Sequence, residues 1–398
     1  MKRIALLWLC CFSSAYMLFG QVLKPGFNPN EYAEMLRIGM QQNNPVPDTV
    51  FPKALKFDVS YESPTMGMGN AWQLWTAKPN NPLKVAVISL RATTEESSSW
   101  AENLHSVMVN ATGKLSLEKN FTFNYRLAKN QRASVHIGWL IGTAYLQRDI
   151  TPKIDSCYQK GIKDFIITGH SQGGALSYLL RAYYQYEQLA GRIPSDITFK
   201  MYASAAPKPG NLYFAQDYES YTQKGWSYNV VNSEDWVPQV PLSMQTMGDF
   251  AASNPFKYYK KGTEDLPLLS RWVVRGKFKG IMRRMDRSKR KYNRIMGKEF
   301  GVLVQEFLPE YKIKSDYTST NYQRCGNQIT LLADEDYYIH VRRNHPNVFR
   351  NHGLDAYQLL LETYYAQELA SEYVIYANNT YPFLKEFPRT TPKNVSNE

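Results

Sequence analysis

The chain has few of the residues on which metal and redox chemistry depend, with only four cysteines and six histidines among its 398 residues. Cys10 and Cys11 lie in an apolar N-terminal run, and neither Cys157 nor Cys325 has the spacing of a metal ligand. A phosphate-binding loop and a dinucleotide-binding fingerprint are also missing. We therefore expect a protein that works without a cofactor. The sequence leaves open whether Cys157 and Cys325 form a disulfide.

Long apolar runs are scarce as well. Beyond the N-terminus, no stretch reaches the roughly 20 apolar residues that a membrane-spanning helix needs. At the N-terminus, two basic residues precede a mostly apolar run over residues 4–19, and Gly20 offers a small residue for cleavage, which is typical of a secretory signal. The alternative is a membrane anchor, but two serines interrupt the run. We expect residues 1–20 to be a signal peptide and the protein to be secreted or periplasmic.

Acidic residues are outnumbered by basic ones, 35 to 47, and the excess lies in one segment. Arg271 to Lys298 contains twelve Lys or Arg and one acidic residue, Asp286, so the rest of the chain is close to neutral. Large apolar side chains, such as Trp272 and Phe278, alternate with these charges. A cationic amphipathic segment of this kind favours contact with a lipid interface. A solvated helix face and nucleic-acid affinity are the alternatives, and we expect no nucleic-acid partner.

Strand-like and helix-like segments alternate along most of the chain, which is typical of a parallel sheet covered by helices. Nearly continuous apolar runs predict strands that are buried on both faces, at residues 83–90, 164–168, 198–203 and 228–231. Helices are expected at residues 30–42, with Asn30 as the cap, at 174–189 and at 355–369.

We predict a single α/β domain over residues 21–398, with a mostly parallel sheet flanked by helices. The segment from about residue 242 to 331 carries the basic run and is too long for an ordinary connection, so we interpret it as a helical insertion. The tail after residue 377 is polar and contains prolines, which favours poor order.

The motif GHSQG at residues 169–173 follows the apolar run 164–168 and precedes a helix-forming run. A nucleophile elbow needs small residues on both sides of its serine, because the chain turns sharply and strand and helix approach closely. A glycine-rich turn with an incidental serine is the alternative. The strand before the motif and the helix after it favour an elbow, with Ser171 as the nucleophile.

A serine hydroxyl is a weak nucleophile, so a histidine must take its proton and an acid must hold the imidazole. These partners follow an elbow serine in the order acid, then histidine. The histidine candidates are the three that lie downstream of Ser171, namely His340, His345 and His352. Among the acids, Asp235 follows closely after a predicted strand, which is a suitable position. Glu234 and Asp249 are its competitors.

Several motifs resemble those of the class 3 lipases, the fungal-type triacylglycerol lipase family. GHSQGGAL at residues 169–176 is similar to the family's elbow, which usually has Leu in place of Gln172. VVNSEDWVP at residues 230–238 resembles the strand that ends in the family's catalytic aspartate. NHGLDAY at residues 351–357 resembles its histidine motif, and VHIGW at residues 135–139 looks like a motif whose histidine is structural. The order of these motifs makes the resemblance specific.

The resemblance implies an α/β-hydrolase fold and a catalytic triad of Ser171, Asp235 and His352. The oxyanion of such an enzyme is met by positioned N–H donors, one of them on the residue after the nucleophile, here Gln172. By its match to a family Phe-Arg-Gly-Thr motif, Thr93 supplies the second donor. Ala replaces the motif's Gly at residue 92, which leaves open whether Thr93 or Thr94 contributes.

The same resemblance implies a secreted serine carboxylic ester hydrolase that cleaves acylglycerols through an acyl-enzyme intermediate. A phospholipase or a feruloyl-type esterase would use the same triad. A non-catalytic lipid-binding protein on a hydrolase scaffold is the alternative from another class. Members of the family often carry a mobile lid, and residues 95–120 occupy its position, where an ordinary surface loop and helix is the other interpretation.

Overall fold

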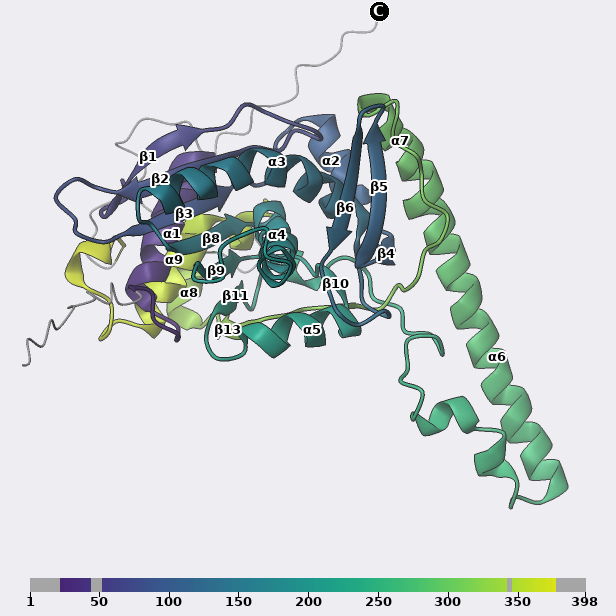
Figure 1. Cartoon of the computed structure of the whole chain (residues 1–398). Coiled ribbons are helices and arrows are strands. Elements are labelled where there is room, and N and C mark those ends of the chain that lie inside the picture. The colour runs from purple at the N-terminus through teal and green to yellow at the C-terminus, as the bar shows by residue number, and fades with distance from the viewer. Residues whose placement is uncertain (1–21, 44–51, 342–345, 377–398) are drawn as a thin grey trace, which may run out of the picture.

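The computed structural model describes residues 22–43, 52–341 and 346–376. Its centre is a seven-stranded sheet in the order β1-β2-β3-β8-β9-β11-β13 (Figure 1). The strands span Phe57–Glu62 (β1), Trp72–Ala77 (β2), Val85–Leu90 (β3), Asp164–His170 (β8), Thr198–Ser204 (β9), Ser227–Asn232 (β11) and Asn327–Leu331 (β13). The first three strands pair antiparallel, and every pair from β3 to β13 is parallel. The mostly parallel sheet of the α/β-hydrolase fold is thereby confirmed.

Successive residues of each parallel strand face opposite sides of the sheet. In β3, Val85 and Val87 pack into one hydrophobic cluster, whereas Ala86 and Ile88 pack into the other. Both faces are therefore covered by apolar side chains, which explains why these strands are continuous apolar runs in the sequence.

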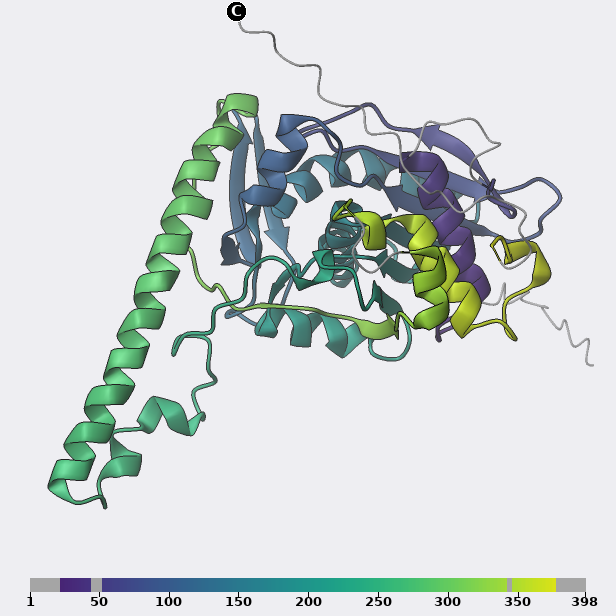
Figure 2. The ribbon, with the colours of Figure 1, turned by 180° about the vertical axis from the view of Figure 1, so that it is seen from behind.

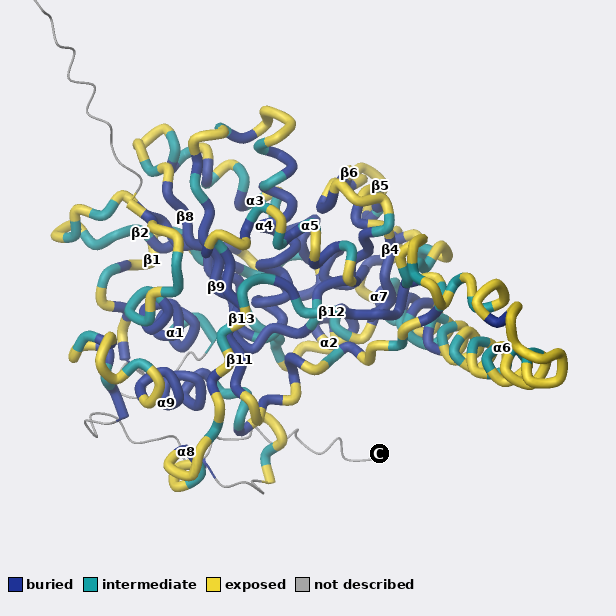
Figure 3. Tube along the Cα trace, turned by 90° about the horizontal axis from the view of Figure 1, so that it is seen from below, coloured by how far each residue is buried: buried dark blue, intermediate teal, exposed yellow. Residues whose placement is uncertain are grey.

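Helices flank the sheet on both faces. On one face lie α1 (Pro29–Asn43) and α9 (Leu354–Tyr364), which run side by side in purple and yellow-green in Figure 2. On the other face lie α3 (Ile137–Gln159), α4 (Gln172–Leu189) and α5 (Leu212–Thr222). Figure 3 shows the central strands β3, β8, β9 and β11 and much of these helices buried.

Two smaller sheets adjoin this body, one in the order β12-β10-β7-β4 and the other a β5-β6 hairpin. Their strands are Met108–Asn110 (β4), Thr112–Glu118 (β5), Phe121–Arg126 (β6), Ser134–His136 (β7), Gly210–Asn211 (β10) and Tyr322–Gln323 (β12). Short helical elements complete the chain: α2 (Ser97–Leu104), α8 (Glu335–His340), η1 (Val237–Gln239), η2 (Pro255–Tyr258), η3 (Lys261–Thr263), η5 (Arg350–His352) and η6 (Ser371–Tyr373).

The basic segment forms an arm that projects from the body (Figures 1 and 2). It consists of α6 (Leu268–Tyr292), a π-helical stretch (Asn293–Glu299, η4) and α7 (Phe300–Phe307). At its base, the Tyr292 hydroxyl donates to the Ser106 carbonyl at 2.9 Å, and His105 Nδ1 donates to the Met296 carbonyl at 2.9 Å. The arm is thus fixed to the chain that follows α2.

The insertion expected over residues 242–331 needs a correction at its C-terminal end. Strand β13 (Asn327–Leu331) pairs in parallel with β11, and Leu331 is fully buried in the core. Its sequence is short and half polar, so it was not predicted as a strand of the main sheet. The central sheet therefore resumes at residue 327, before the expected boundary.

The cap of α1 is Asn28 and not the expected Asn30. The Asn28 Oδ1 accepts from the backbone N–H groups of Asn30 at 2.9 Å and Glu31 at 3.2 Å. The Asn30 side chain instead accepts from the Ala370 N–H at 2.7 Å. It therefore ties the start of α1 to the chain after α9.

Cys157 and Cys325 are free, buried thiols. Burial raises the pKa of both thiols, which makes them poor nucleophiles. No helix in the described part of the chain is long and apolar enough to cross a membrane. The expected signal peptide, His345 and the tail after residue 377 lie outside the described residues.

Candidate active site

Ser171 occupies a strained turn between β8 and α4. Its backbone angles are φ 58° and ψ −125°, which L-residues rarely adopt. The two glycines of the motif make this turn possible. A Cβ on Gly173 would lie 2.3 Å from the Leu90 carbonyl oxygen, and a Cβ on Gly169 would lie 2.3 Å from the Gly173 carbonyl carbon. The chain therefore turns as a nucleophile elbow does.

Parallel strands bring the other predicted residues to the same edge of the sheet. Thr93 follows the end of β3, Ser171 follows β8, and Asp235 follows β11. Because the carboxyl ends of parallel strands meet at one edge, the three side chains gather there. His352 ends the η5 turn directly before α9, which packs against β11 and β13.

The Asp235 carboxylate is buried and holds His352. His352 Nδ1 lies 2.7 Å from Asp235 Oδ2. The Tyr357 hydroxyl donates to the same oxygen at 2.8 Å, and the Val237 N–H donates to the other carboxylate oxygen at 3.0 Å. Because a carboxylate only accepts, Nδ1 of His352 carries a hydrogen, and Nε2 is the nitrogen that can take up a proton. Burial and the nearby Asp235 charge keep the pKa of Tyr357 far above its usual value, so its hydroxyl stays a donor.

The turn that carries His352 is fixed on both sides. Arg350 Nη1 donates to Asp355 Oδ2 at 2.8 Å, and both side chains are buried. Asn232, the last residue of β11, donates from Nδ2 to the Asn351 carbonyl at 2.9 Å. These bonds hold the imidazole close to the end of β11, where Asp235 lies.

His170, which precedes the nucleophile, also holds this turn. Its Nε2 donates to the His352 carbonyl at 2.7 Å. Burial, followed by the neighbouring His352, keeps the pKa of His170 well below its usual value, so the ring is neutral and Nδ1 accepts. The Ser204 hydroxyl donates to that nitrogen at 3.2 Å and in turn accepts from the Tyr32 hydroxyl at 2.7 Å. A hydrogen-bonded chain therefore runs from α1 to the backbone of His352.

Asn103 joins the two residues expected to form the oxyanion hole. Its Nδ2 lies 3.0 Å from Thr93 Oγ1 and 3.2 Å from Gln172 Oε1. Its Oδ1 accepts from Trp139 Nε1 at 2.8 Å, which fixes the orientation of the amide. Ser99 adds a second hydrogen bond to Gln172 Oε1, at 3.0 Å. The backbone N–H of Gln172 belongs to the first turn of α4, where N–H groups have no acceptor within the helix.

The alanine at residue 92 fits without strain. Among the described residues other than glycine, only Ser171 and Ala205 have a positive φ, so the loop does not require glycine at residue 92. The Thr94 N–H is already bonded to Ser99 Oγ at 3.2 Å. This contact favours Thr93 over Thr94 as the donor.

A buried carboxyl group lies behind the elbow. Glu102 is fully buried, and its Oε2 accepts from Asn70 Nδ2 at 2.6 Å. Burial raises the pKa of Glu102 to about 8, although hydrogen bonding from Asn70 and Gln172 opposes the shift. The polar Gln172 therefore has a polar neighbour beneath it, where the related motif has an apolar leucine.

The alternative candidates for the acid and the histidine do not take part in the Asp235–His352 pair. Glu234 is exposed, and Asp249 accepts hydrogen bonds from the backbone and side chain of Thr246 at 2.7 and 2.9 Å. His340 is exposed at the end of α8. His136 accepts from the Trp139 N–H and caps α3, as expected of a structural histidine.

The Ser171 hydroxyl makes no hydrogen bond to His352 within the described residues, although the His170 and His352 rings are only 4.7 Å apart. Catalytic hydrogen bonds are often long without substrate and tighten in the complex. In the described part of the chain, no group of His, Cys, Asp or Glu side chains is arranged to hold a metal ion.

Four contributors were missed by sequence reasoning: Tyr357, His170, Asn103 and Glu102. Tyr357 and His170 lie inside motifs that were recognised, but nothing in those motifs shows what their side chains contact. Asn103 and Glu102 lie outside any motif, and only the fold brings them to the elbow.

The fold and this site define an α/β-hydrolase. The class 3 lipase family model matches residues 87–245, which include the elbow and Asp235, so the resemblance to this family is confirmed over that segment.

Similar solved structures include triacylglyceride lipase from Rhizomucor miehei, at 18% identity over 53% of this chain and 74% of that one, with a TM-score of 0.40. A lipase from Rhizopus microsporus var. chinensis is 20% identical over 54% and 69% of the two chains, with a TM-score of 0.38. The mono- and diacylglycerol lipase from Aspergillus oryzae is 15% identical over 55% and 76%, with a TM-score of 0.36. The comparison with curated proteins found no match.

Proposed function

We propose that the protein is an exported serine hydrolase that cleaves carboxylic esters of lipids, with Ser171, Asp235 and His352 as its triad. The observation that carries this proposal is the buried Asp235–His352 pair, with 2.7 Å between Nδ1 and Oδ2, next to the strained serine turn. A buried carboxylate on one imidazole nitrogen prepares the other nitrogen to act as a base. The class 3 lipase match over residues 87–245 supports the same reaction.

In the proposed reaction, Ser171 Oγ attacks the ester carbonyl carbon while His352 Nε2 takes the hydroxyl proton. The oxyanion that forms accepts from the Gln172 N–H and from a donor of Thr93. When the intermediate collapses, the carbon–oxygen bond to the alcohol breaks, and His352 gives its proton to the leaving oxygen. Water, deprotonated by His352, then attacks the acyl-enzyme, and the acid and free Ser171 result.

The surface next to His352 supports an acyl lipid as the substrate. Trp236, Val348 and Phe349 are exposed apolar residues, and the Phe349 ring lies 6.1 Å from the His352 ring. The Trp236 and Phe349 rings lie 5.4 Å apart, so they form one apolar rim. Trp236→Ala should lower kcat/KM for long-chain esters about tenfold, because it removes one large apolar contact, and should change short-chain turnover little. Equal losses of kcat/KM on long-chain and short-chain esters would show that the rim does not bind the acyl chain.

The basic segment from Arg271 to Lys298 is proposed to contact the lipid interface. Its concentration of cations supports attraction to anionic lipid. Deleting the segment from a protein that still folds should reduce activity on emulsions more than on a soluble short-chain ester.

A fluorophosphonate probe tests the nucleophile. We expect the probe to label Ser171 of the wild-type protein, to fail on Ser171→Ala, and to label Ser233→Ala normally, because Ser233 lies at the same edge without a role in the site. A wild-type protein that the probe does not label would favour a non-catalytic lipid-binding protein. A panel of acylglycerols, phospholipids and feruloyl esters then separates a lipase from a phospholipase or a feruloyl-type esterase.

A further inference from the structure

The free end of α6 exposes large apolar side chains. Leu268, Leu269 and Trp272 are 80%, 77% and 76% exposed, and they belong to the first turns of the helix, at the end of the arm away from its base (Figure 1). Three adjacent side chains of this size are unusual on a free surface and indicate a contact site.

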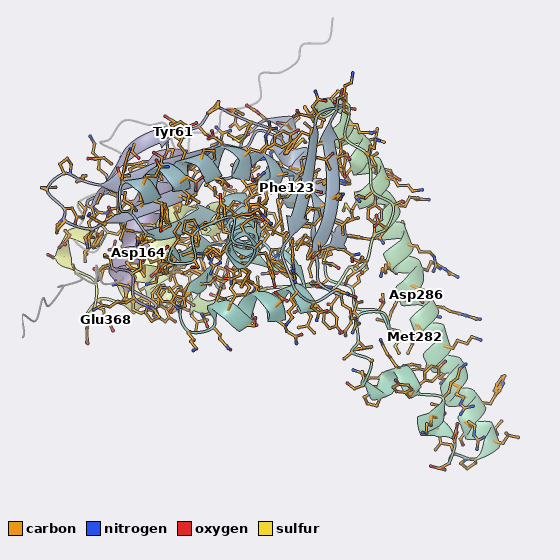
Figure 4. All side chains as sticks on the ribbon, in the orientation of Figure 1. Tyr61, Phe123, Asp164, Met282, Asp286 and Glu368 are labelled. Carbon is orange, nitrogen blue, oxygen red and sulfur yellow. The ribbon has the colours of Figure 1, made fainter. Side chains whose placement is uncertain are left out.

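One face of α6 carries apolar side chains that are half-buried. Phe278 lies 4.5 Å, between ring centroids, from Tyr259, and Met282 and Met285 are half-buried on the same face of α6. At Phe278, this face of α6 therefore packs on the segment that carries Phe256 and Tyr259. Figure 4 marks Met282 and Asp286, one helical turn apart, in the middle of the arm.

Helix α6, which forms the shaft of the arm, is strongly cationic. Helix α6 contains ten Lys or Arg and a single acidic residue, Asp286. Arg275 Nε donates to Thr263 Oγ1 at 2.7 Å, within the arm. Across the described residues, no Lys or Arg of α6 forms an ion pair with a carboxylate. In the part of the chain that the structure describes, ion pairs therefore leave the positive charge of α6 uncompensated.

We propose that the arm is a peripheral membrane anchor whose end inserts Leu268, Leu269 and Trp272 into a bilayer that contains anionic lipid. Such a bilayer satisfies both features, because its hydrocarbon accepts the leucines and its headgroups attract the shaft. Trp is also favoured at the boundary between hydrocarbon and headgroups. A nucleic acid would pair with the cations but would leave the apolar end in water. With 25 residues, α6 is about 37 Å long, so the anchor reaches well beyond the body.

This proposal extends the lipid contact proposed above but does not depend on the chemistry of Ser171. Its test is cosedimentation of the full chain with vesicles of phosphatidylcholine alone and of phosphatidylcholine mixed with phosphatidylserine. We expect binding to the mixed vesicles, weak binding to the neutral ones, and release by high salt.

Two sets of variants separate the contribution of the apolar end from that of the cations. Replacing Leu268, Leu269 and Trp272 together by Ser should weaken binding to the mixed vesicles about 1000-fold, since each buried side chain contributes about tenfold. A second variant, Arg283→Gln/Arg284→Gln/Arg287→Gln, should weaken it about fivefold for each cation removed. The matched control is Leu189→Ser, at the far end of α4, where an exposed leucine should have no effect.

The idea is overturned if the wild-type protein does not sediment with mixed vesicles, or if the triple serine variant binds them as the wild type does. Duplex DNA that binds the wild-type protein and the serine variant equally, and displaces vesicles, would assign the cations to nucleic acid instead. Turnover of a soluble ester should be unchanged in both arm variants, which confirms that they fold. Vesicle binding without fluorophosphonate labelling would reject the hydrolase and keep the anchor, and the reverse result would reject only the anchor.

Discussion

The hydroxyl of Tyr357 offers a sharp test of how the acid is held. It is fully buried and donates to Asp235 Oδ2 at 2.8 Å, the same oxygen that accepts from His352. Tyr357→Phe removes this single bond and keeps the ring. A hydrogen bond to a charged group contributes about 1.5–3 kcal/mol, so the free energy of unfolding should fall by up to that amount.

The catalytic effect follows from the same bond. Asp235 then has one fewer contact that fixes its direction toward His352, and the imidazolium of the transition state is less well supported. If the whole loss appears in the transition state, the rate falls about tenfold at the lower limit and about 150-fold at the upper one, because about 1.4 kcal/mol corresponds to a factor of ten. We expect a loss of about tenfold in both kcat and kcat/KM, with KM unchanged.

The measurement is steady-state hydrolysis of a soluble short-chain ester, alongside urea unfolding of the same variant. The control is Tyr218→Phe, which removes another fully buried hydroxyl, bonded to Ser227 Oγ at 2.8 Å and outside the site. That neutral bond contributes about 0.5–1.5 kcal/mol to stability, and its loss should leave kcat unchanged. A Tyr357→Phe protein that loses stability but keeps the wild-type kcat would refute the reasoning, because Tyr357 would then only support the fold.

Three further predictions concern the surroundings of the site. Gly173→Ala should lower kcat about 100-fold in the same ester assay, because its Cβ would lie 2.3 Å from the Leu90 carbonyl and displace the elbow. Asp355→Ala should lower the free energy of unfolding by about 3–5 kcal/mol in urea, because it breaks the buried ion pair with Arg350 by removing one partner; a loss below about 1 kcal/mol would show that the pair is dispensable. Glu102 has its pKa raised from 4.5 to about 8, so the folded protein holds a proton that the unfolded chain releases, and stability should fall as pH rises from about 4.5 to 8. Glu102→Gln should lack this decline, and an identical pH dependence of unfolding would contradict the assignment.

The parallel part of the sheet could be predicted because helices cover both of its faces. Such strands must be apolar at every position, and this produces the continuous runs that mark β3 and β8 in the sequence. The edge strand β1 is mostly exposed and has no such run, so its sequence did not predict it. In β13, exposed and buried residues are mixed within five positions, and it was therefore assigned to the insertion.

The candidate site was predictable where its chemistry is local. The turn at Ser171 requires particular neighbours in the sequence, and these neighbours form a motif. The position of Asp235 after a strand is also a local feature. By contrast, Asn103 contacts Gln172 across 69 residues of chain, and no local pattern specifies such a pair. Supporting contacts of this kind arise from packing and become visible only in the folded chain.

The helix α2 and the residues directly after it connect the arm to Thr93 and Gln172, the two residues proposed to form the oxyanion hole. At one end, Asn103 contacts Thr93 and Gln172. At the other, His105 donates to the Met296 carbonyl, and its Nε2 accepts from the Tyr311 hydroxyl at 3.0 Å.

This segment lies where the sequence suggested either a lid or an ordinary loop and helix. A lid must separate from the body at small cost. Opening α2 would break the contacts of Asn103 with the elbow and the hydrogen bond from Asn70 to Glu102. His105 would also lose its hydrogen bonds to the Met296 carbonyl and the Tyr311 hydroxyl. The loss of these hydrogen bonds favours α2 as a fixed support of the elbow over α2 as a lid.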